Sequence, residues 1–265
     1  MIILIHTSKT MRPAGSNNKS VLTQPVLIAK ARVLANNLKN LSQEDIEKMM
    51  KISPKLATTT KNLILSWNNN PSCQRPAIDS FLGDIYSGLQ VASLTEQDRL
   101  YAHQHVRILS GLYGVLRPLD GIYPYRFEMG YRLPRSDVAN LYQFWGSTIA
   151  DTLVKAEPIV DLTAVEYSKT ITKYIEATRI VTPRFLTHTK KEGQRIGDPV
   201  FVVVHAKIAR GAFANWMIRN RIEDVKRLKD FAEIGYEYNE ALSTDSVPVF
   251  ICKDFKGLGL SVRLS

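Results

Sequence analysis

The segment IILIH at residues 2–6 decides the fold class. An apolar run of this length predicts a buried strand, and the polar segment TSKT at residues 7–10 follows it directly. Because ligands gather at the carboxyl ends of strands in open α/β sheets, this segment is a candidate ligand edge and Lys9 is a candidate binding residue. A solvated loop lysine would give the same sequence.

Helical patterns dominate the N-terminal third of the chain. Apolar residues recur at helical spacing over 26–38. Ser42, followed three residues later by Asp45, predicts a capped helix to about residue 51, and the Ser-Pro pair at 53–54 predicts another to about residue 67. Three capped or proline-started helices are therefore expected before residue 68.

Strands and helices interleave along the rest of the chain. Gly83 and Gly88 within FLGDIYSGL imply a close approach of two backbones. Polar segments at 11–24 and 68–71 predict irregular structure. Further helices are predicted at about 96–109, 141–155, 207–221 and 223–231, and strands at 159–163, 179–187, 200–205 and 247–253.

The order of these elements predicts an α/β fold with a mixed sheet whose strands come from distant parts of the chain. No repeat, low-complexity tract or linker divides the sequence, so one compact domain over residues 1–265 is expected. Within it, the segment at about 40–157 is expected to form a mostly helical lobe packed on the sheet.

The composition favours some classes of protein and excludes others. A hydrophobic content of 45% is typical of a globular protein, and no run approaches the roughly 20 apolar residues that span a membrane. The opening MIILIH is too short for a signal peptide, so a cytoplasmic protein without membrane partners is expected. Cys73 and Cys252 lack the spacing of a disulfide framework or a zinc site.

A net charge of +10, from 35 Lys and Arg against 25 Asp and Glu, favours anionic partners. Such a surplus attracts polyanions over long distances, and nucleic acid is the leading inference. Net charge does not locate a binding site, and many basic proteins bind no polyanion. The placement of the basic residues must therefore decide whether the chain has a site for a polyanion.

The segment at 103–128 carries the strongest local pattern for phosphate binding. The helix predicted at 96–109 runs into Gly111 and Gly114, and Arg117 and Arg126 follow. A helix, a Gly-x-x-Gly turn and a second structured segment resemble a helix-hairpin-helix, in which glycines let backbone N–H groups approach a phosphate. A glycine cap that simply ends the helix before a proline is the alternative.

A second basic pair lies in AKIARG at 206–211, at a predicted junction of strand and helix. Lys207 and Arg210 are three residues apart and share one helix face, and a helix N-terminus itself attracts anions. The pair is a candidate phosphate or carboxylate site. Pairing with an internal Asp or Glu is the alternative.

The remaining patterns predict no metal centre and no cofactor. The histidines show no metal-ligand spacing, and neither a Ser-His-Asp order nor a P-loop nor a dinucleotide-binding fingerprint occurs with its required flanks. These histidines are His6, His103, His105, His188 and His205.

Several blocks of the sequence resemble the signature blocks of the peroxide stress protein YaaA family. They are FLGDIYSGL at 81–89, LSGLYGVLRPLD at 109–120, PYRFEMG at 124–130, LYQFWG at 141–146, EY at 166–167 and AKIARG at 206–211. The resemblance implies a bacterial cytoplasmic protein of the peroxide stress response that limits free iron and protects DNA. It also implies a compact α/β fold with a positively charged cleft, a helix-hairpin-helix and DNA binding.

The family's functional positions fall on the residues that were singled out above, and Glu128 joins Arg126 as an acidic and basic pair. The resemblance therefore implies a duplex-DNA site of weak sequence preference. Its residues are Lys9, Gly111, Gly114, Arg117, Arg126, Lys207 and Arg210.

Departures from the family pattern near the expected cleft motivate a rival hypothesis. His6 and His205 stand where the family usually has other residues. The rival is an enzyme that acts on a small anionic or nucleotide substrate with His6, Glu128 and His205 as acid–base groups. Convergence of the two histidines in the folded chain would favour it.

Overall fold

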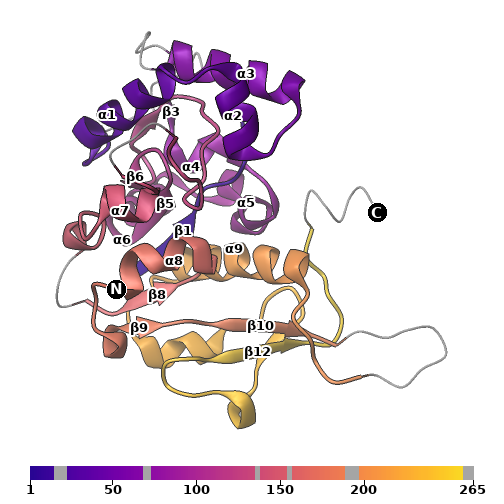
Figure 1. Cartoon of the computed structure of the whole chain (residues 1–265). Coiled ribbons are helices and arrows are strands. Elements are labelled where there is room, and N and C mark those ends of the chain that lie inside the picture. The colour runs from indigo at the N-terminus through magenta and orange to yellow at the C-terminus, as the bar shows by residue number, and fades with distance from the viewer. Residues whose placement is uncertain (15–22, 68–72, 135–137, 154–156, 189–196, 259–265) are drawn as a thin grey trace.

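A five-stranded sheet forms the centre of the computed structural model, which describes residues 1–14, 23–67, 73–134, 138–153, 157–188 and 197–258 (Figure 1). The strand order is β6-β5-β1-β8-β9. Four strands are parallel, and β6 is antiparallel to β5. The strands are β1 (Ile2–His6), β5 (Val106–Ser110), β6 (Gly114–Leu116), β8 (Ile159–Asp161) and β9 (Ile180–Val181).

The IILIH strand is the middle strand of this sheet, and all five of its residues are buried. Its neighbours β5 and β8 begin about 100 and 150 residues further along the chain. The predicted α/β class, with a mixed sheet drawn from distant segments in a single compact unit, is therefore confirmed.

The three helices of the N-terminal third lie at one end of the molecule (Figure 1). They are α1 (Ile28–Lys39), α2 (Gln43–Met50) and α3 (Pro54–Ser66). The Ser42 hydroxyl accepts a hydrogen bond from the backbone of Asp45, whose carboxylate accepts one from the backbone of Ser42 in return. Ser53 caps α3 through Leu56, so both cap predictions are confirmed.

Two helices pack so closely that glycine is required at their contact. These are α5 (Asp84–Leu89) and α9 (Val203–Arg219). A Cβ atom on Gly88 would lie 2.0 Å from the carbonyl oxygen of Ile208, and one on Gly211 would lie 1.9 Å from that of Ile85. The predicted close approach at Gly88 is confirmed, and α9 is its partner.

A second sheet packs on the other side of α9 (Figure 1). Its order is β10-β12-β11, and its core is an aromatic cluster of Phe185, Phe213, Phe231 and Phe250. The strands are β10 (Arg184–Thr187), β11 (Tyr236–Tyr238) and β12 (Val249–Cys252). The helix α9 therefore lies between this sheet and α5.

Short elements complete the described chain. The strands are β2 (Thr10–Met11), β3 (Arg75–Pro76), β4 (Phe81–Leu82) and β7 (Gly121–Ile122). The α-helices are α4 (Ala77–Ser80), α6 (Glu96–His105), α7 (Leu141–Trp145) and α8 (Val165–Thr172). The 3-10 helices are η2 (Val91–Ser93), η3 (Ala150–Thr152), η4 (Ala177–Arg179), η5 (Val225–Asp230) and η6 (Glu240–Leu242). Among the described helices, none combines the length and apolar character needed to cross a membrane.

Several predicted elements differ from the structure. The strand predicted at 179–187 is divided between β9 in the central sheet and β10 in the second sheet, and the helix predicted at 223–231 is the 3-10 helix η5. The helix predicted to about residue 109 ends at His105, because residues 106–110 pair with β1 as strand β5. The strand predicted at 200–205 is largely the start of α9. The helix predicted at 141–155 is divided into α7 and η3.

Some predictions fall beyond the described residues. Residues 15–22, 68–72 and 154–156 lie outside them. The structure therefore does not describe most of the irregular segment predicted at 11–24, the break predicted at 68–71, or the end of the helix predicted to residue 155. The segment at 40–157, expected to be mostly helical, also contributes β5 and β6 to the central sheet.

Candidate functional site

A pocket of about 390 Å³, here called the sheet-edge pocket, opens at the carboxyl end of β1. Ligand sites are expected at such an edge. Five parts of the chain meet there: the end of β1 and its following loop, the start of α5, the segment before α7, the start of α8, and α9. The polar residues that matter most are His6, Lys9, Glu128, Glu166, Tyr167 and Lys207.

His6 forms a buried, neutral part of this pocket. Its ring stacks on Tyr167 with 4.8 Å between centroids, and its Nδ1 accepts a hydrogen bond from the backbone N–H of Ala164 at 3.3 Å. Burial, reinforced by the charges of Arg210 and Lys207, lowers its pKa from 6.5 to about 3. Because Nδ1 accepts a hydrogen bond in the neutral ring, the proton is on Nε2.

Two carboxylates lie together beside Lys9. Glu128 forms an ion pair with Lys9, with 3.0 Å between Oε2 and Nζ, and the Tyr131 hydroxyl donates to the same oxygen at 3.3 Å. Glu166 accepts a hydrogen bond from the backbone N–H of Gly130 at 2.6 Å. Burial raises the pKa of Glu166, and the charge of Glu128 adds to that rise, while the Gly130 N–H opposes it.

Lys207 and Arg210 lie beyond the first turn of α9, because this helix begins at Val203. The prediction that they occupy a helix N-terminus is therefore wrong. Lys207 is exposed, whereas Arg210 is partly buried and faces the charge of Asp161. Among the described residues, neither side chain forms a hydrogen bond or ion pair.

Burial disfavours the charged forms of both Arg210 and Asp161, which attract each other without forming an ion pair. It raises the pKa of Asp161 and lowers the pKa of Arg210, and in each case the attraction between them opposes the effect. Thr163 adds two hydrogen bonds to the Asp161 carboxylate, at 2.9 Å from its N–H and 2.6 Å from its hydroxyl. The charge of Arg210 is close enough to His6 to lower the pKa of its ring.

Arg126 holds the loop that carries Lys9. Its Nη1 donates to the carbonyl oxygen of Lys9 at 3.2 Å, while its buried Nε has no partner among the described residues. The sequence-predicted residues His6, Lys9, Glu128 and Lys207 therefore line one pocket, and Arg126 and Arg210 lie next to it.

Arg117 lies away from this pocket. It follows β6, which runs antiparallel to β5 with Leu116 opposite Ile108, so Arg117 lies near the beginning of β5. Lys9, by contrast, follows the end of β1, which runs parallel to β5. Arg117 pairs with the fully buried Asp120 at 3.0 Å. Its predicted place in one cleft with Lys9 is therefore wrong.

The glycine turn is a tight β-hairpin and not a helix-hairpin-helix. Gly111 follows β5, Gly114 is the first residue of β6, and both are buried. Trp145 donates its indole N–H to the Gly111 carbonyl at 3.1 Å, and a Cβ on Gly114, whose φ is 71°, would meet the Trp145 ring at 2.9 Å. Gly114 makes room for Trp145 and Gly111 for the backbone of Phe127 and Glu128, so the buried turn offers no surface for a phosphate.

His205 lies against the second sheet. Its ring stacks on Phe255 with 3.8 Å between centroids, and its Nδ1 is 3.2 Å from the Thr187 hydroxyl. Burial lowers its pKa. His205 is absent from the lining of the sheet-edge pocket, so the structure does not assemble His6, Glu128 and His205 into one acid–base site.

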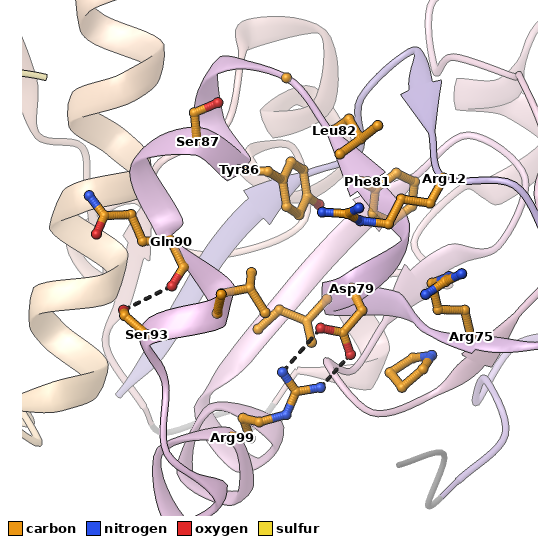
Figure 2. Close-up of a pocket in the computed structure, with 15 residues that line it drawn as sticks. Arg12, Arg75, Asp79, Phe81, Leu82, Tyr86, Ser87, Gln90, Ser93 and Arg99 are labelled. Atoms are coloured by element: carbon orange, nitrogen blue, oxygen red, sulfur yellow. Dashed lines mark hydrogen bonds and ion pairs between the residues drawn. The ribbon is translucent and has the colours of Figure 1, made fainter. Parts of the chain in front are cut away.

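A larger cavity of about 780 Å³, here called the arginine cavity, lies next to the sheet-edge pocket (Figure 2). Gly83 lines both, and α5 forms a wall of each. Arg99 donates to Asp79 through both of its terminal nitrogens, one of them at 3.1 Å. Arg12 and Arg75 point into the same space, Arg12 beside Tyr86 (Figure 2).

Arg12 and Arg75 have no carboxylate partner among the described residues. Arg75 makes one long hydrogen bond, of 3.4 Å, to the carbonyl of Pro13, and its buried Nε is unpaired. The pairing of β2 with β4 and of β3 with β7 brings them to this cavity. Sequence reasoning missed both, because Arg12 begins a polar segment and Arg75 follows a break.

Metal ligation has no cluster to support it in the described part of the chain. No group of three or more His, Cys, Asp or Glu side chains gathers there in a way that could hold an ion.

Comparison with known proteins places the chain in a family. A protein called UPF0246 protein from Salinispora tropica is 56% identical over 263 residues, which cover 99% of this chain and 98% of the relative. A UPF0246 protein from Clostridium beijerinckii is 38% identical over 94% of this chain and 97% of the relative. The family model described as peroxide stress protein YaaA matches residues 1–242. The chain belongs to the peroxide stress protein YaaA family.

Proposed function

We propose that this protein binds DNA in the peroxide stress response and that the arginine cavity receives the phosphates of the DNA backbone. The observation that carries the proposal is the pair Arg12 and Arg75, which line an open cavity without a carboxylate partner among the described residues. The family name supports a role in peroxide stress. The net charge of +10 supports a polyanionic partner.

The chemistry of the two arginines suits phosphate. A guanidinium presents its donors in a planar fork that matches phosphate oxygens, and charge-assisted hydrogen bonds of this kind are the strong ones. The only side-chain hydrogen bond of Arg75 among the described residues is the long one from its Nη2 to the Pro13 carbonyl, so its terminal nitrogens keep donors for a phosphate. Asp79 neutralises Arg99 in the same cavity, so the cations available to a phosphate there are Arg12 and Arg75.

The basic residues predicted from the sequence extend the proposed site across Gly83. Lys207 is exposed on the sheet-edge side of α5, and Lys9, although paired with Glu128, is also exposed there. Both can reach phosphates outside the pocket that they line. Arg126 supports the Lys9 loop from behind.

A salt series tests the proposal. A labelled DNA duplex is titrated at several salt concentrations with wild type, with Arg12→Ala/Arg75→Ala, and with Lys51→Ala/Lys55→Ala, which removes equal charge from exposed positions near α2 and α3. Each lost phosphate contact should reduce the slope of log affinity against log salt by about 0.9.

The expected result is a slope lower by about 1.8 in the arginine double variant, as two lost contacts predict, and an unchanged slope in the lysine control. Equal slopes in all three proteins would refute phosphate binding at the arginine cavity. Absence of any binding at low salt would refute DNA binding altogether.

A further inference from the structure

The geometry points to a second ligand site: we propose that the sheet-edge pocket binds a small amino-acid-like zwitterion, with its carboxylate at His6 and its ammonium group at Glu128 and Glu166. This site is distinct from the proposed DNA site, and its occupant differs in size and charge. A volume of about 390 Å³ is within the range of small-molecule pockets.

His6 is the first argument for a ligand. Its side chain lines the pocket although the residue is only 9% exposed. With Nδ1 occupied by the Ala164 N–H, Nε2 carries the proton, and no acceptor for it exists among the described residues. Because the His6 side chain lines the pocket, an oxygen of a bound ligand would accept a hydrogen bond from this N–H.

Charge selects an anionic oxygen for that donor. Lys207 and Arg210 both impose positive potential on His6, strongly enough to contribute to the low pKa of its ring. A carboxylate at Nε2 would therefore meet one N–H donor and two nearby positive charges. A neutral carbonyl would gain less from the same arrangement.

Two carboxylates of the same lining, Glu128 and Glu166, select a cation. Lys9 and Tyr131 both bind Oε2 of Glu128, and Gly130 binds Oε1 of Glu166. Each carboxylate thus keeps one oxygen without a partner among the described residues. An ammonium group between them would donate hydrogen bonds to both carboxylates, and its positive charge would relieve their mutual repulsion.

The His6 N–H and the carboxylates of Glu128 and Glu166 together favour a zwitterion over a simple anion. A phosphate or a dicarboxylate would meet repulsion from Glu128 and Glu166, and Asp84 adds a third carboxylate to the lining. A simple amine would leave the His6 N–H without an acceptor. Only a ligand that carries both groups satisfies the donor and the free carboxylate oxygens.

The test compares whole ligands with their halves. The twenty common free L-amino acids are screened with the full chain by thermal shift, and any hit is measured by calorimetry beside the amine and the carboxylic acid of matching side chain. For L-alanine these are ethylamine and propionate. The expected result is binding of at least one amino acid, with each half-ligand at least tenfold weaker.

Variants assign the site. Glu166→Gln is expected to weaken the bound amino acid about tenfold, and His6→Gln by at least as much. Glu240→Gln, at an exposed carboxylate of η6, is the matched control and should leave affinity unchanged. If His6→Gln fails to fold, Glu166→Gln still decides the question, because its carboxyl is only half buried.

Several outcomes would overturn the proposal. These are the absence of binding by all twenty amino acids at millimolar concentration, equal binding of a half-ligand, or an unchanged affinity in Glu166→Gln. The DNA affinity of Glu166→Gln is measured in parallel and should equal that of wild type. Its loss would show instead that the pocket carboxylates support the DNA site, which separates the failure of this proposal from the failure of DNA binding.

Discussion

The arginine cavity and the sheet-edge pocket share Gly83 and a wall of α5, yet they differ in charge and in origin. The arginine cavity takes Arg12 from the residue after β2, Arg75 from β3 and Arg99 from α6, and Asp79 is the carboxylate of its described lining. The sheet-edge pocket lies at the end of β1 and balances lysines with carboxylates. Of these two cavities, the one beside the expected ligand edge has an excess of positive charge, and the one at that edge does not.

The largest expected effect comes from the wall that the two cavities share. Gly88→Ala would place a Cβ 2.0 Å from the Ile208 carbonyl and 2.9 Å from the Ala212 nitrogen, so α5 must separate from α9. We expect the free energy of unfolding to fall by about 3 kcal/mol or more, as for severe overpacking. Chemical denaturation measures it, with Ser87→Ala as a control that should cost less than about 0.5 kcal/mol. A small effect at Gly88 would mean that the helices are not in close contact.

The pH dependence of stability should distinguish the two cavities. The folded chain holds His6 with a pKa of about 3 against an ordinary value of 6.5, so the unfolded chain binds the proton more readily. The stability that His6 contributes is fully present above pH 6.5 and is lost as the pH falls towards 3, by up to about 1.4 kcal/mol per pH unit.

Denaturation of wild type, His6→Gln and Arg12→Ala/Arg75→Ala between pH 7 and pH 5 checks this expectation. The slope of stability against pH should be shallower in His6→Gln and unchanged in the arginine variant. A slope in His6→Gln equal to that of wild type would contradict the buried, neutral state of His6.

Lys207 measures how far the proposed DNA site extends across Gly83. Lys207→Ala should reduce the salt slope by about 0.9, which is half the loss expected from the two arginines together. Glu128→Gln serves as the charge-opposite comparison and should not lower DNA affinity. An unchanged slope in Lys207→Ala would confine DNA to the arginine cavity.

The smallest expected effect is a gain. Asp79→Asn removes the carboxylate that neutralises Arg99 and leaves a third free guanidinium in the arginine cavity. We expect DNA affinity at low salt to rise by a few-fold, with a slope steeper by up to about 0.9. A drop in affinity without loss of stability would show that Arg99 needs Asp79 for its position.

Local patterns predicted the elements whose stability is local. The caps at Ser42 and Ser53 and the strand at 2–6 depend on side chains within a few residues, and the structure confirms them. The sequence also predicted the close approach at Gly88, because a glycine inside a helical pattern usually indicates that another backbone packs against it. Lys9 was placed at a strand end by the same kind of reasoning.

Elements that depend on distant pairing were not predicted. Residues 106–110 continue a helical pattern but become β5, because β1 on one side and β6 on the other complete their hydrogen bonds. That change turns the expected helix-hairpin-helix into a buried β-hairpin and carries Arg117 away from Lys9. Arg12 and Arg75 line one cavity because β2 pairs with β4 and β3 pairs with β7. The local spacing of residues in the sequence does not predict these long-range pairings.

Protection of arginines from chemical modification tests the central claim most directly. Phenylglyoxal labels accessible guanidinium groups, and mass spectrometry measures the labelling of each arginine with and without a saturating DNA duplex at low salt. Binding of phosphates in the arginine cavity predicts strong protection of Arg12 and Arg75, with Arg117 and Arg184 unchanged. Equal labelling of Arg12 and Arg75 with and without bound DNA would contradict it.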